Sequence, residues 1–280
     1  MSNLIIRDLN LDFQGVEFVW NPSQPAFSYL ANIISFQAVG FEKFICRTVH
    51  QALPVIEDPA LADEAKDFLD QEAKHAKAHM AHVKGLIGRY PELRAVFDET
   101  MADFERKWEA SDLHYMITYS AIIEGTSLPL YKIMIDHRDK LILGGDERVA
   151  SLLLWHFSEE IEHRSSALKI YNAVVRKPFY RLKLFPEVGR HLAQNMNRIA
   201  RRFGEIVPGV AQLDLRQAMT SVPRWDRIKM TASLLASQLP ISDPSKGSMP
   251  EFCKAMLDKM DAAKQQRPTV IDGGRAKGRR

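Results

Sequence analysis

The chain has few of the residues on which several protein classes depend. Only two cysteines occur among its 280 residues, Cys46 and Cys253, and they stand far apart in the sequence. Neither a disulfide framework nor a thiolate zinc site is supported, so any bound metal must be held by oxygen and nitrogen atoms. The stretch 1–13 carries Arg7 and Asp8 and lacks the apolar run of a secretory signal, so we expect a cytoplasmic protein.

The chain also lacks an uninterrupted apolar run long enough to cross a membrane. The nearest approach, 116–135, is interrupted by Glu124, Gly125, Pro129 and Lys132. A carboxylate at the middle of a lipid-embedded helix would be costly, so this stretch predicts a buried helix instead. Neither sign of charge dominates, since 38 basic residues face 35 acidic ones, and nucleic-acid binding is not indicated.

Apolar residues make up 46% of the chain, which is enough for a full core, and their spacing is helical. No alternating run of useful length predicts a strand. Asp58 followed by Pro59 is typical of a helix start. The predicted helices span 26–51, 59–87, 91–108, 112–136, 147–176, 186–203, 213–220, 223–237 and 250–264. We therefore expect one all-α domain over 1–280, made of a bundle (26–176), a helical cap (177–264) and a disordered basic tail (265–280).

Four glutamates occupy helix faces that are otherwise apolar or made of small residues. They are Glu42, Glu72, Glu124 and Glu160. Burying one unpaired carboxylate costs several kcal/mol, so four in one core require compensating cations or protons. Two divalent metal ions would supply four positive charges against four negative ones. Ordinary surface salt bridges are the alternative explanation of these acids.

Two of the glutamates belong to a repeated motif. Glu72 and His75, and likewise Glu160 and His163, are three residues apart, which places an oxygen and a nitrogen ligand one helical turn apart. Each pair follows a lone glutamate at an interval close to one helix plus a turn. This is the ligand pattern of carboxylate-bridged two-metal bundles. Oxygen and imidazole ligands suit iron or manganese, so we expect two iron ions, with manganese or a mixed Mn/Fe pair as the alternative.

These motifs resemble those of the ferritin-like superfamily and, within it, of a bacterial family labelled predicted metal-dependent hydrolases. The resemblance rests on FEKF at 41–44, QEAKH at 71–75, IE at 123–124 and WHFSEEIEH at 155–163. It covers most of the chain to about residue 176. It implies a ferritin-like four-helix bundle with additional C-terminal helices.

Further histidines and acids lie next to these motifs. The spacing of His156 and Glu160 is similar to the ligand pattern of di-iron arylamine N-oxygenases, which implies that His156 is a seventh ligand. His79 is interpreted as an outer or substrate-pocket histidine, with direct ligation as the alternative. Glu159 and Glu162 flank the ligand face and are expected to be solvated or to support the ligands from outside. The expected metal ligands are Glu42, Glu72, His75, Glu124, His156, Glu160 and His163.

The sequence favours three functions in order. The first is a non-haem di-iron oxygenase or oxidase that uses O2 to hydroxylate or N-oxygenate a small organic substrate, with an electron donor that the sequence does not identify. The second, which the family label implies, is a dimetal-dependent hydrolase, in which two metals activate water. The third is a non-catalytic metal-binding bundle. A homodimer is compatible with the sequence.

A basic segment follows the predicted bundle. Residues 176–202 carry eight basic residues against one acid, Glu187, with aromatic and aliphatic residues between them. The segment could contact an anionic substrate or a membrane surface. An amphipathic cap helix with a solvated basic face explains it equally well.

Overall fold

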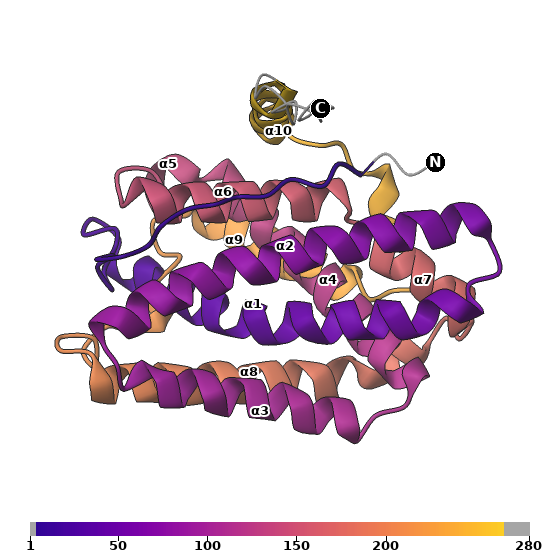
Figure 1. The fold of residues 1–280 in the computed structure, drawn as a ribbon, viewed down its shortest axis with the longest axis horizontal. Helices are drawn as coiled ribbons and strands as arrows, with labels where there is room; N and C mark the ends of the chain where they lie inside the picture. The colour runs from indigo at the N-terminus through magenta and orange to yellow at the C-terminus, as the bar shows by residue number, and fades with distance from the viewer. Residues whose placement is uncertain (1–3, 266–280) are drawn as a thin grey trace, which may run out of the picture.

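All regular structure in the described part of the chain, residues 4–265 of the computed structural model, is helical (Figure 1). The α-helices are α1 (Pro25–Ala52), α2 (Pro59–Arg89), α3 (Leu93–Glu109), α4 (Leu113–Asp136), α5 (Arg138–Leu141), α6 (Glu147–Glu162), α7 (Ser166–Val174), α8 (Tyr180–Ile206), α9 (Arg224–Ala236) and α10 (Glu251–Gln265). Short 3-10 turns occur at Leu53–Val55, Leu215–Gln217 and Pro244–Lys246. The all-α class is confirmed. The predicted tail lies outside the described residues, apart from its first residue, which ends α10.

Local side-chain chemistry sets several helix starts. The Asp58 carboxylate accepts a hydrogen bond from the Ala60 amide at 2.9 Å, with Pro59 in the first turn, as the sequence predicts. At α4 the cap is Asp112, whose carboxylate accepts from the Tyr115 amide at 2.8 Å. The preceding Ser111 instead donates to the Lys107 carbonyl at the end of α3. The helix predicted from residue 112 therefore begins at Leu113, with Asp112 as its cap.

The predicted helix 147–176 is broken into α6 and α7. His163 ends α6, and the Ser166 amide donates to the His163 carbonyl in a turn. Arg164 donates to the Ile161 carbonyl at 2.7 Å and so satisfies an acceptor that a continuing helix would have used. Ser166, the first residue of α7, donates its hydroxyl to Glu64 at 2.7 Å. Because of this break, the residues after His163 do not continue the helical register of α6.

Two other predicted helices also differ. The helix predicted over 213–220 is only the 3-10 turn Leu215–Gln217. The helix predicted to begin at Pro186 begins instead at Tyr180 and continues through Pro186. A proline in a helix removes one hydrogen bond donor, and here the apolar face that α8 buries, with Leu184, Val188 and Phe203, holds the helix together.

Four helices form a closed ring around one interior. Helix α1 packs against α2 and α4, and α6 packs against α4 and α2. The remaining helices cover this ring: α3 and α8 pack together below α1 in Figure 1, α9 lies on α4, and α10 contacts α6. The first residues, from 4 to about 20, run along α2 and α6 in the same view. The four helices of the ring are therefore the segments that carry the predicted ligands.

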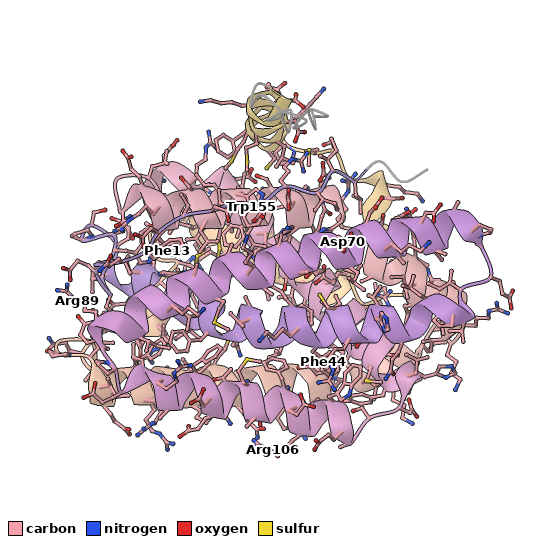
Figure 2. The ribbon with its side chains drawn as sticks, in the orientation of Figure 1. Phe13, Phe44, Asp70, Arg89, Arg106 and Trp155 are labelled. Carbon is pink, nitrogen blue, oxygen red and sulfur yellow. The ribbon has the colours of Figure 1, made fainter. Side chains whose placement is uncertain are left out.

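Aromatic side chains fill the space around the ring. Trp155 is fully buried (Figure 2). Phe44 on α1 meets Trp108 on α3 with ring centroids 5.6 Å apart. Arg106, on the same helix α3, points to solvent in that view. Within residues 4–265, no helix is both long enough and apolar enough to cross a membrane.

Candidate metal centre

The interior of the ring brings together all seven side chains predicted as ligands. Helix α1 provides Glu42, α2 provides Glu72 and His75, α4 provides Glu124, and α6 with its last turn provides His156, Glu160 and His163. None of them is more than 9% exposed. Acids are seldom buried to this extent without partners, so the arrangement needs a compensating positive charge.

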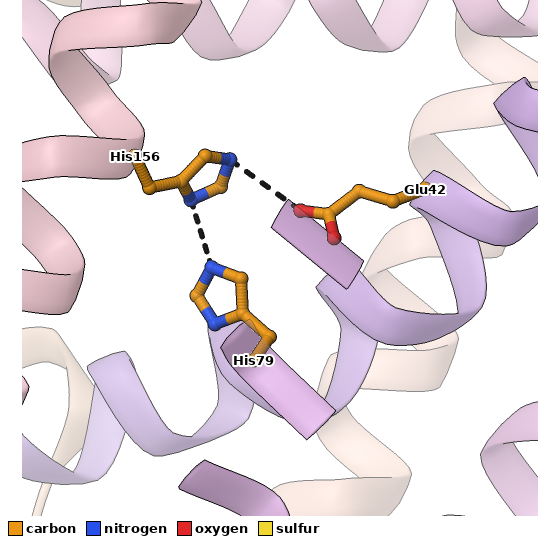
Figure 3. A group of neighbouring side chains, drawn as sticks. All are labelled: Glu42, His79 and His156. Carbon is orange, nitrogen blue, oxygen red and sulfur yellow. Dashed lines mark hydrogen bonds and ion pairs between the residues drawn. The ribbon is translucent and has the colours of Figure 1, made fainter. Parts of the chain in front are cut away.

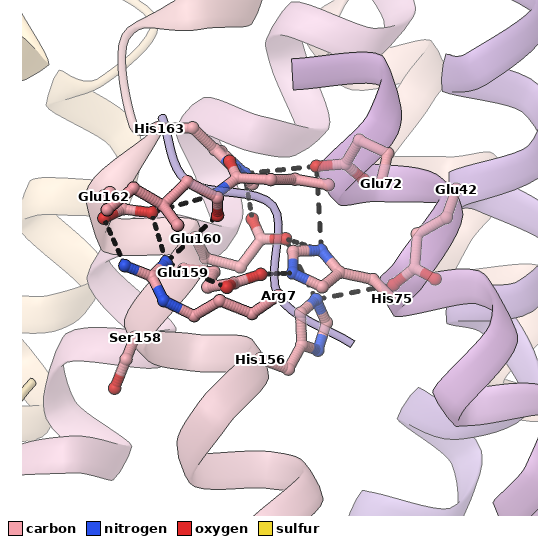
Figure 4. Close-up of polar contacts among 12 residues, drawn as sticks. Arg7, Glu42, Glu72, His75, His156, Ser158, Glu159, Glu160, Glu162 and His163 are labelled. Atoms are coloured by element: carbon pink, nitrogen blue, oxygen red, sulfur yellow. Dashed lines mark hydrogen bonds and ion pairs between the residues drawn. The ribbon is translucent and has the colours of Figure 1, made fainter. Parts of the chain in front are cut away.

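Glu160 lies at the middle of the cluster (Figure 4). Its Oε1 is 2.9 Å from His156 Nε2 and 3.4 Å from His75 Nδ1. Its Oε2 is 3.5 Å from His163 Nε2. The two oxygens of one carboxylate therefore face two different sets of ligand atoms.

The two sets share Glu160 and differ in their other members. In the first, Glu72, Glu124, Glu160 and His163 offer ligand atoms that all lie within 4.8 Å of one another. In the second, His75, His156 and Glu160 do the same. Glu42 joins the second set, since its Oε1 is 3.4 Å from His156 Nε2 (Figure 3). Each set is large enough to hold one metal ion, with a shared carboxylate between them.

Each of the three histidines is held from its outer side. His75 Nε2 lies 2.9 Å from Glu159 Oε2, and His163 Nδ1 lies 3.0 Å from the side-chain oxygen of Gln71. In the neutral form of the ring, donation of the outer N–H to such an acceptor leaves the inner nitrogen unprotonated and aimed at the carboxylates. This is the usual arrangement of a metal-binding histidine.

His79 takes the corresponding outer position for His156. Its Nε2 lies 2.8 Å from His156 Nδ1, and its Nδ1 lies 3.0 Å from the Ser35 hydroxyl (Figure 3). Ser35 in turn contacts His82 Nδ1 at 2.9 Å. These contacts favour the interpretation of His79 as a residue that orients His156, although Glu42, His79 and His156 also form a group that could hold a metal ion.

Several buried atoms of the cluster have no hydrogen-bond partner among residues 4–265. They are Glu42 Oε2, both oxygens of Glu72, His75 Nδ1 and His163 Nε2. His163 Nε2 is 3.1 Å from Glu72 Oε1, yet the two do not meet in hydrogen-bond geometry. Leaving a buried polar group unsatisfied costs about 1–3 kcal/mol. Lone pairs that converge in this way fit cations at their common centre.

The charges of the cluster are strongly perturbed. Burial raises the pKa of Glu72 well above its usual range, and the neighbouring carboxylates Glu160 and Glu124 raise it further. Burial likewise raises the pKa of Glu124 to about 7, with Glu160 adding to the effect. Burial would also raise the pKa of Glu160, but His163 and the other two histidines lower it well below the ordinary value. Without cations, the cluster must therefore keep protons near neutral pH.

The outer support includes residues that sequence reasoning missed. Arg7 is 4% exposed, and its guanidinium donates to Glu159 at 3.0 Å and to Glu162 at 2.8 Å. Gln71 donates to Glu162 at 2.8 Å while accepting from His163. Glu159 is fully buried, so the expectation that it is solvated was wrong and the alternative, support of the ligands, fits. No periodic signal marks Arg7, because it lies in an irregular segment.

Two cavities reach the cluster. The larger, of about 720 Å³, is lined by Glu124 together with residues of α4, α9 and the 237–244 segment. The smaller, of about 220 Å³, is lined by Glu42, His156, Glu160, Tyr131 and mostly apolar side chains. The ring of Tyr131 stacks on Phe157, with centroids 4.5 Å apart. Each cavity approaches a different set of ligand atoms.

A helical ring that encloses this many carboxylates and imidazoles has the character of a metal-binding protein. The chain belongs to the predicted metal-dependent hydrolase family, whose model matches residues 5–236. No curated protein and no solved structure gives a significant match. The match covers all seven residues of the cluster. The relationship to the ferritin-like superfamily stays a prediction.

Proposed function

We propose that the protein is a metal-dependent hydrolase whose buried centre holds two divalent cations. One observation carries the proposal: nitrogen and oxygen atoms from four helices converge on two points, several of them without a hydrogen-bond partner within residues 4–265, and Glu160 faces both points. Sequence reasoning ranked an O2-activating oxygenase first. Family membership supports the hydrolase instead, so we reverse that order.

The donor atoms fit such a pair. Glu72, Glu124, Glu160 and His163 would hold one cation, and Glu42, His75, His156 and Glu160 the other. Four carboxylates balance two divalent cations, and an oxygen-rich set with imidazoles suits iron or manganese. When bound, such a pair would polarise an ester or phosphoryl group and lower the pKa of a water molecule, so that hydroxide is available to attack that group near neutral pH.

The protein's own residues prepare this centre. Glu159 and Gln71 fix the rings of His75 and His163, so their inner nitrogens stay aimed at the carboxylates. Trp155 packs against His75 with ring centroids 5.0 Å apart, and Phe68 packs against His163 with centroids 4.8 Å apart. Both aromatic rings keep bulk water out. The substrate approaches through the larger cavity, since that cavity opens beside Glu124.

The smaller cavity supports a second candidate function, an O2-activating oxygenase. Its lining of Leu30, Ile34, Phe41 and Leu130 beside Glu42 and His156 would accept a small apolar molecule such as O2. This favours the oxygenase, which needs an electron donor that the hydrolase does not. The identity of the native metal ions helps to separate the hydrolase from the oxygenase.

Metal analysis of the full chain tests the proposed centre. We expect two metal ions per chain after growth with iron and manganese, and one or none in Glu160→Gln, because that side chain faces both sets. Glu105→Gln is the matched control, since Glu105 is an exposed acid on α3 that pairs only with Arg47 in the described structure. A wild-type chain with no bound metal and no metal-dependent rise in melting temperature would refute the proposal.

Activity separates the two reactions. Under strict anaerobiosis we expect the manganese- or zinc-loaded protein to hydrolyse an activated ester or an aryl phosphate, and Glu160→Gln to lose this activity. If the anaerobic protein hydrolyses neither, while the reduced iron form consumes O2 with an organic substrate, the second candidate is correct.

A further inference from the structure

The larger cavity contains a buried cation that the proposed reaction does not yet use. Arg181, in the first turn of α8, lines the same cavity as Glu124 and is only 2% exposed. Its NH1 and NH2 groups donate to the backbone carbonyls of Ser237 and Leu239 at 3.2 and 3.4 Å. Its Nε has no partner, and no carboxylate forms a salt bridge with it within residues 4–265.

This is an unusual situation for a guanidinium. Arginine is rarely so deeply buried unless it is paired with an acid, because desolvating a charge is costly. Burial lowers the pKa of Arg181, which reflects the missing compensation. A ring contact with Tyr171, 5.5 Å away, supplies only a part of what an anion would.

Arg181 also lies close to the α4 backbone beside Glu124. A Cβ built on Gly125, the residue after Glu124, would be 3.9 Å from Arg181 NH1 and 3.2 Å from the Gln238 amide. The backbone of α4 therefore approaches the guanidinium within the cavity that Glu124 and Arg181 both line. A molecule that contacts Arg181 there can extend to Glu124 without leaving the cavity.

The other charges of the cavity leave it positive. Asp226 already pairs with His137 at 3.3 Å and with Lys229 at 3.8 Å. Lys132 forms no salt bridge in the described part of the chain, and Asp136 is exposed. Arg164 is committed to backbone carbonyls, including that of Pro244 at 2.8 Å. Apart from Glu124, four Lys and Arg side chains face two aspartates, which favours an anionic ligand.

We infer that Arg181 binds an anionic group, a carboxylate or a phosphate, of the substrate, an inference that rests on the proposed function. The planar guanidinium can offer two parallel N–H donors to such a group, which a lysine cannot. The anion anchors one end of the substrate, and the bond to be hydrolysed lies toward Glu124. The substrate class is thus a small acid or a phosphorylated molecule rather than a neutral ester.

Anion binding to the full chain tests this inference without relying on turnover. Isothermal titration with inorganic phosphate and, separately, with benzoate is done on metal-loaded and on chelator-treated protein, since chelation removes direct contacts between anion and metal. We expect at least one anion to bind both forms, and Arg181→Met to weaken that binding about tenfold or more. The anion that binds more tightly identifies the class.

The control variant is Arg216→Met, the same replacement at an exposed arginine that pairs with Asp214 and lies outside the residues lining this cavity. Its affinity should stay within about twofold of wild type, as expected for an exposed pair. If Arg181→Met fails to fold, Arg181→Lys takes its place, with an intermediate loss expected because the charge remains and the fork does not. Unchanged affinity in a folded Arg181 variant, or no binding of either anion to wild type, overturns the inference.

The metal content of the same samples separates this inference from the proposed function. Two metals in wild type without any anion binding would refute only the role of Arg181. Anion binding that depends on Arg181 in a chain that takes up no metal would refute the hydrolase and leave the anion site standing.

Discussion

Replacement of Arg7 should weaken the protein far more than its place in an irregular N-terminal segment suggests. One guanidinium contacts three carboxylates: Glu159 at 3.0 Å, Glu162 at 2.8 Å and Asp261 of α10 at 2.8 Å. Arg7 is 4% exposed and Glu159 is fully buried. In Arg7→Gln, Glu159 keeps only its contact with His75, so a buried carboxylate loses its permanent cation.

The magnitude follows from this burial. Removing one partner of a buried ion pair costs about 3–5 kcal/mol, because the remaining charge is left without compensation. That is a large share of the roughly 5–15 kcal/mol by which a folded domain is stable. Arg7→Gln combined with Glu159→Gln should recover part of the loss, since no buried charge then remains unpaired. The double variant, which loses the Glu159 carboxylate, should also bind metal about 10- to 100-fold more weakly, because Glu159 orients His75.

Urea unfolding at pH 7, with and without metal, measures these changes in the free energy of unfolding. The matched control is Lys77→Gln, which also removes a contact between the N-terminal segment and α2, namely the exposed pair of Lys77 with Asp8. We expect Lys77→Gln to lower the free energy of unfolding by about 0–1 kcal/mol. A loss below about 1 kcal/mol in Arg7→Gln, or no recovery in the double variant, would show that the reasoning about buried charge is wrong.

Three further predictions test other parts of the structure. Glu72→Gln should stabilise the metal-free protein by about 1–3 kcal/mol, since it removes a buried charge among like charges, yet abolish the rise in melting temperature on metal addition; a loss of stability in chelator would contradict this. Burial lowers the pKa of His82 to about 4, so the folded state binds fewer protons than the unfolded state, and stability should fall as pH drops from 6.5 to 4. The loss is at most about 3 kcal/mol and should be absent in His82→Gln, which cannot charge; equal slopes in the two proteins would refute it. Gly85→Ala places a methyl group 2.5 Å from the Phe13 carbonyl oxygen and should cost about 1–3 kcal/mol, whereas Gly88→Ala meets nothing within 4 Å and should be neutral or gain up to about 1 kcal/mol in the same urea titration; equal effects would refute the packing argument.

Local chemistry explains why much of the fold was predictable. Asp58 and Pro59 identify a helix start because capping depends only on neighbouring atoms. The break after His163 was missed because no glycine or proline marks it and the hydrogen bonds of Arg164 that stabilise it reach the 244–247 segment, 80 residues later. Contacts at such separation leave no periodic trace in the sequence.

The same division applies to the candidate centre. Six of the seven side chains could be grouped in advance, because a buried acid on an apolar helix face needs a partner and the paired motifs supply one per turn, whereas His156 followed only from the resemblance to di-iron arylamine N-oxygenases. Arg7 and Arg181 could not, since each acts through a long-range contact made by an irregular segment or a helix start. The role of the seven side chains as metal ligands remains a prediction that metal analysis must test.

The two cavities give the centre two separate entrances. Under the proposed function, a fragment bound among the apolar side chains beside His156 leaves the cavity at Arg181 open, so it should slow turnover without competing with the substrate. Glu124 lines the larger cavity and Glu160 lines the smaller one. A compound long enough to reach from one cavity to the other would combine both binding surfaces.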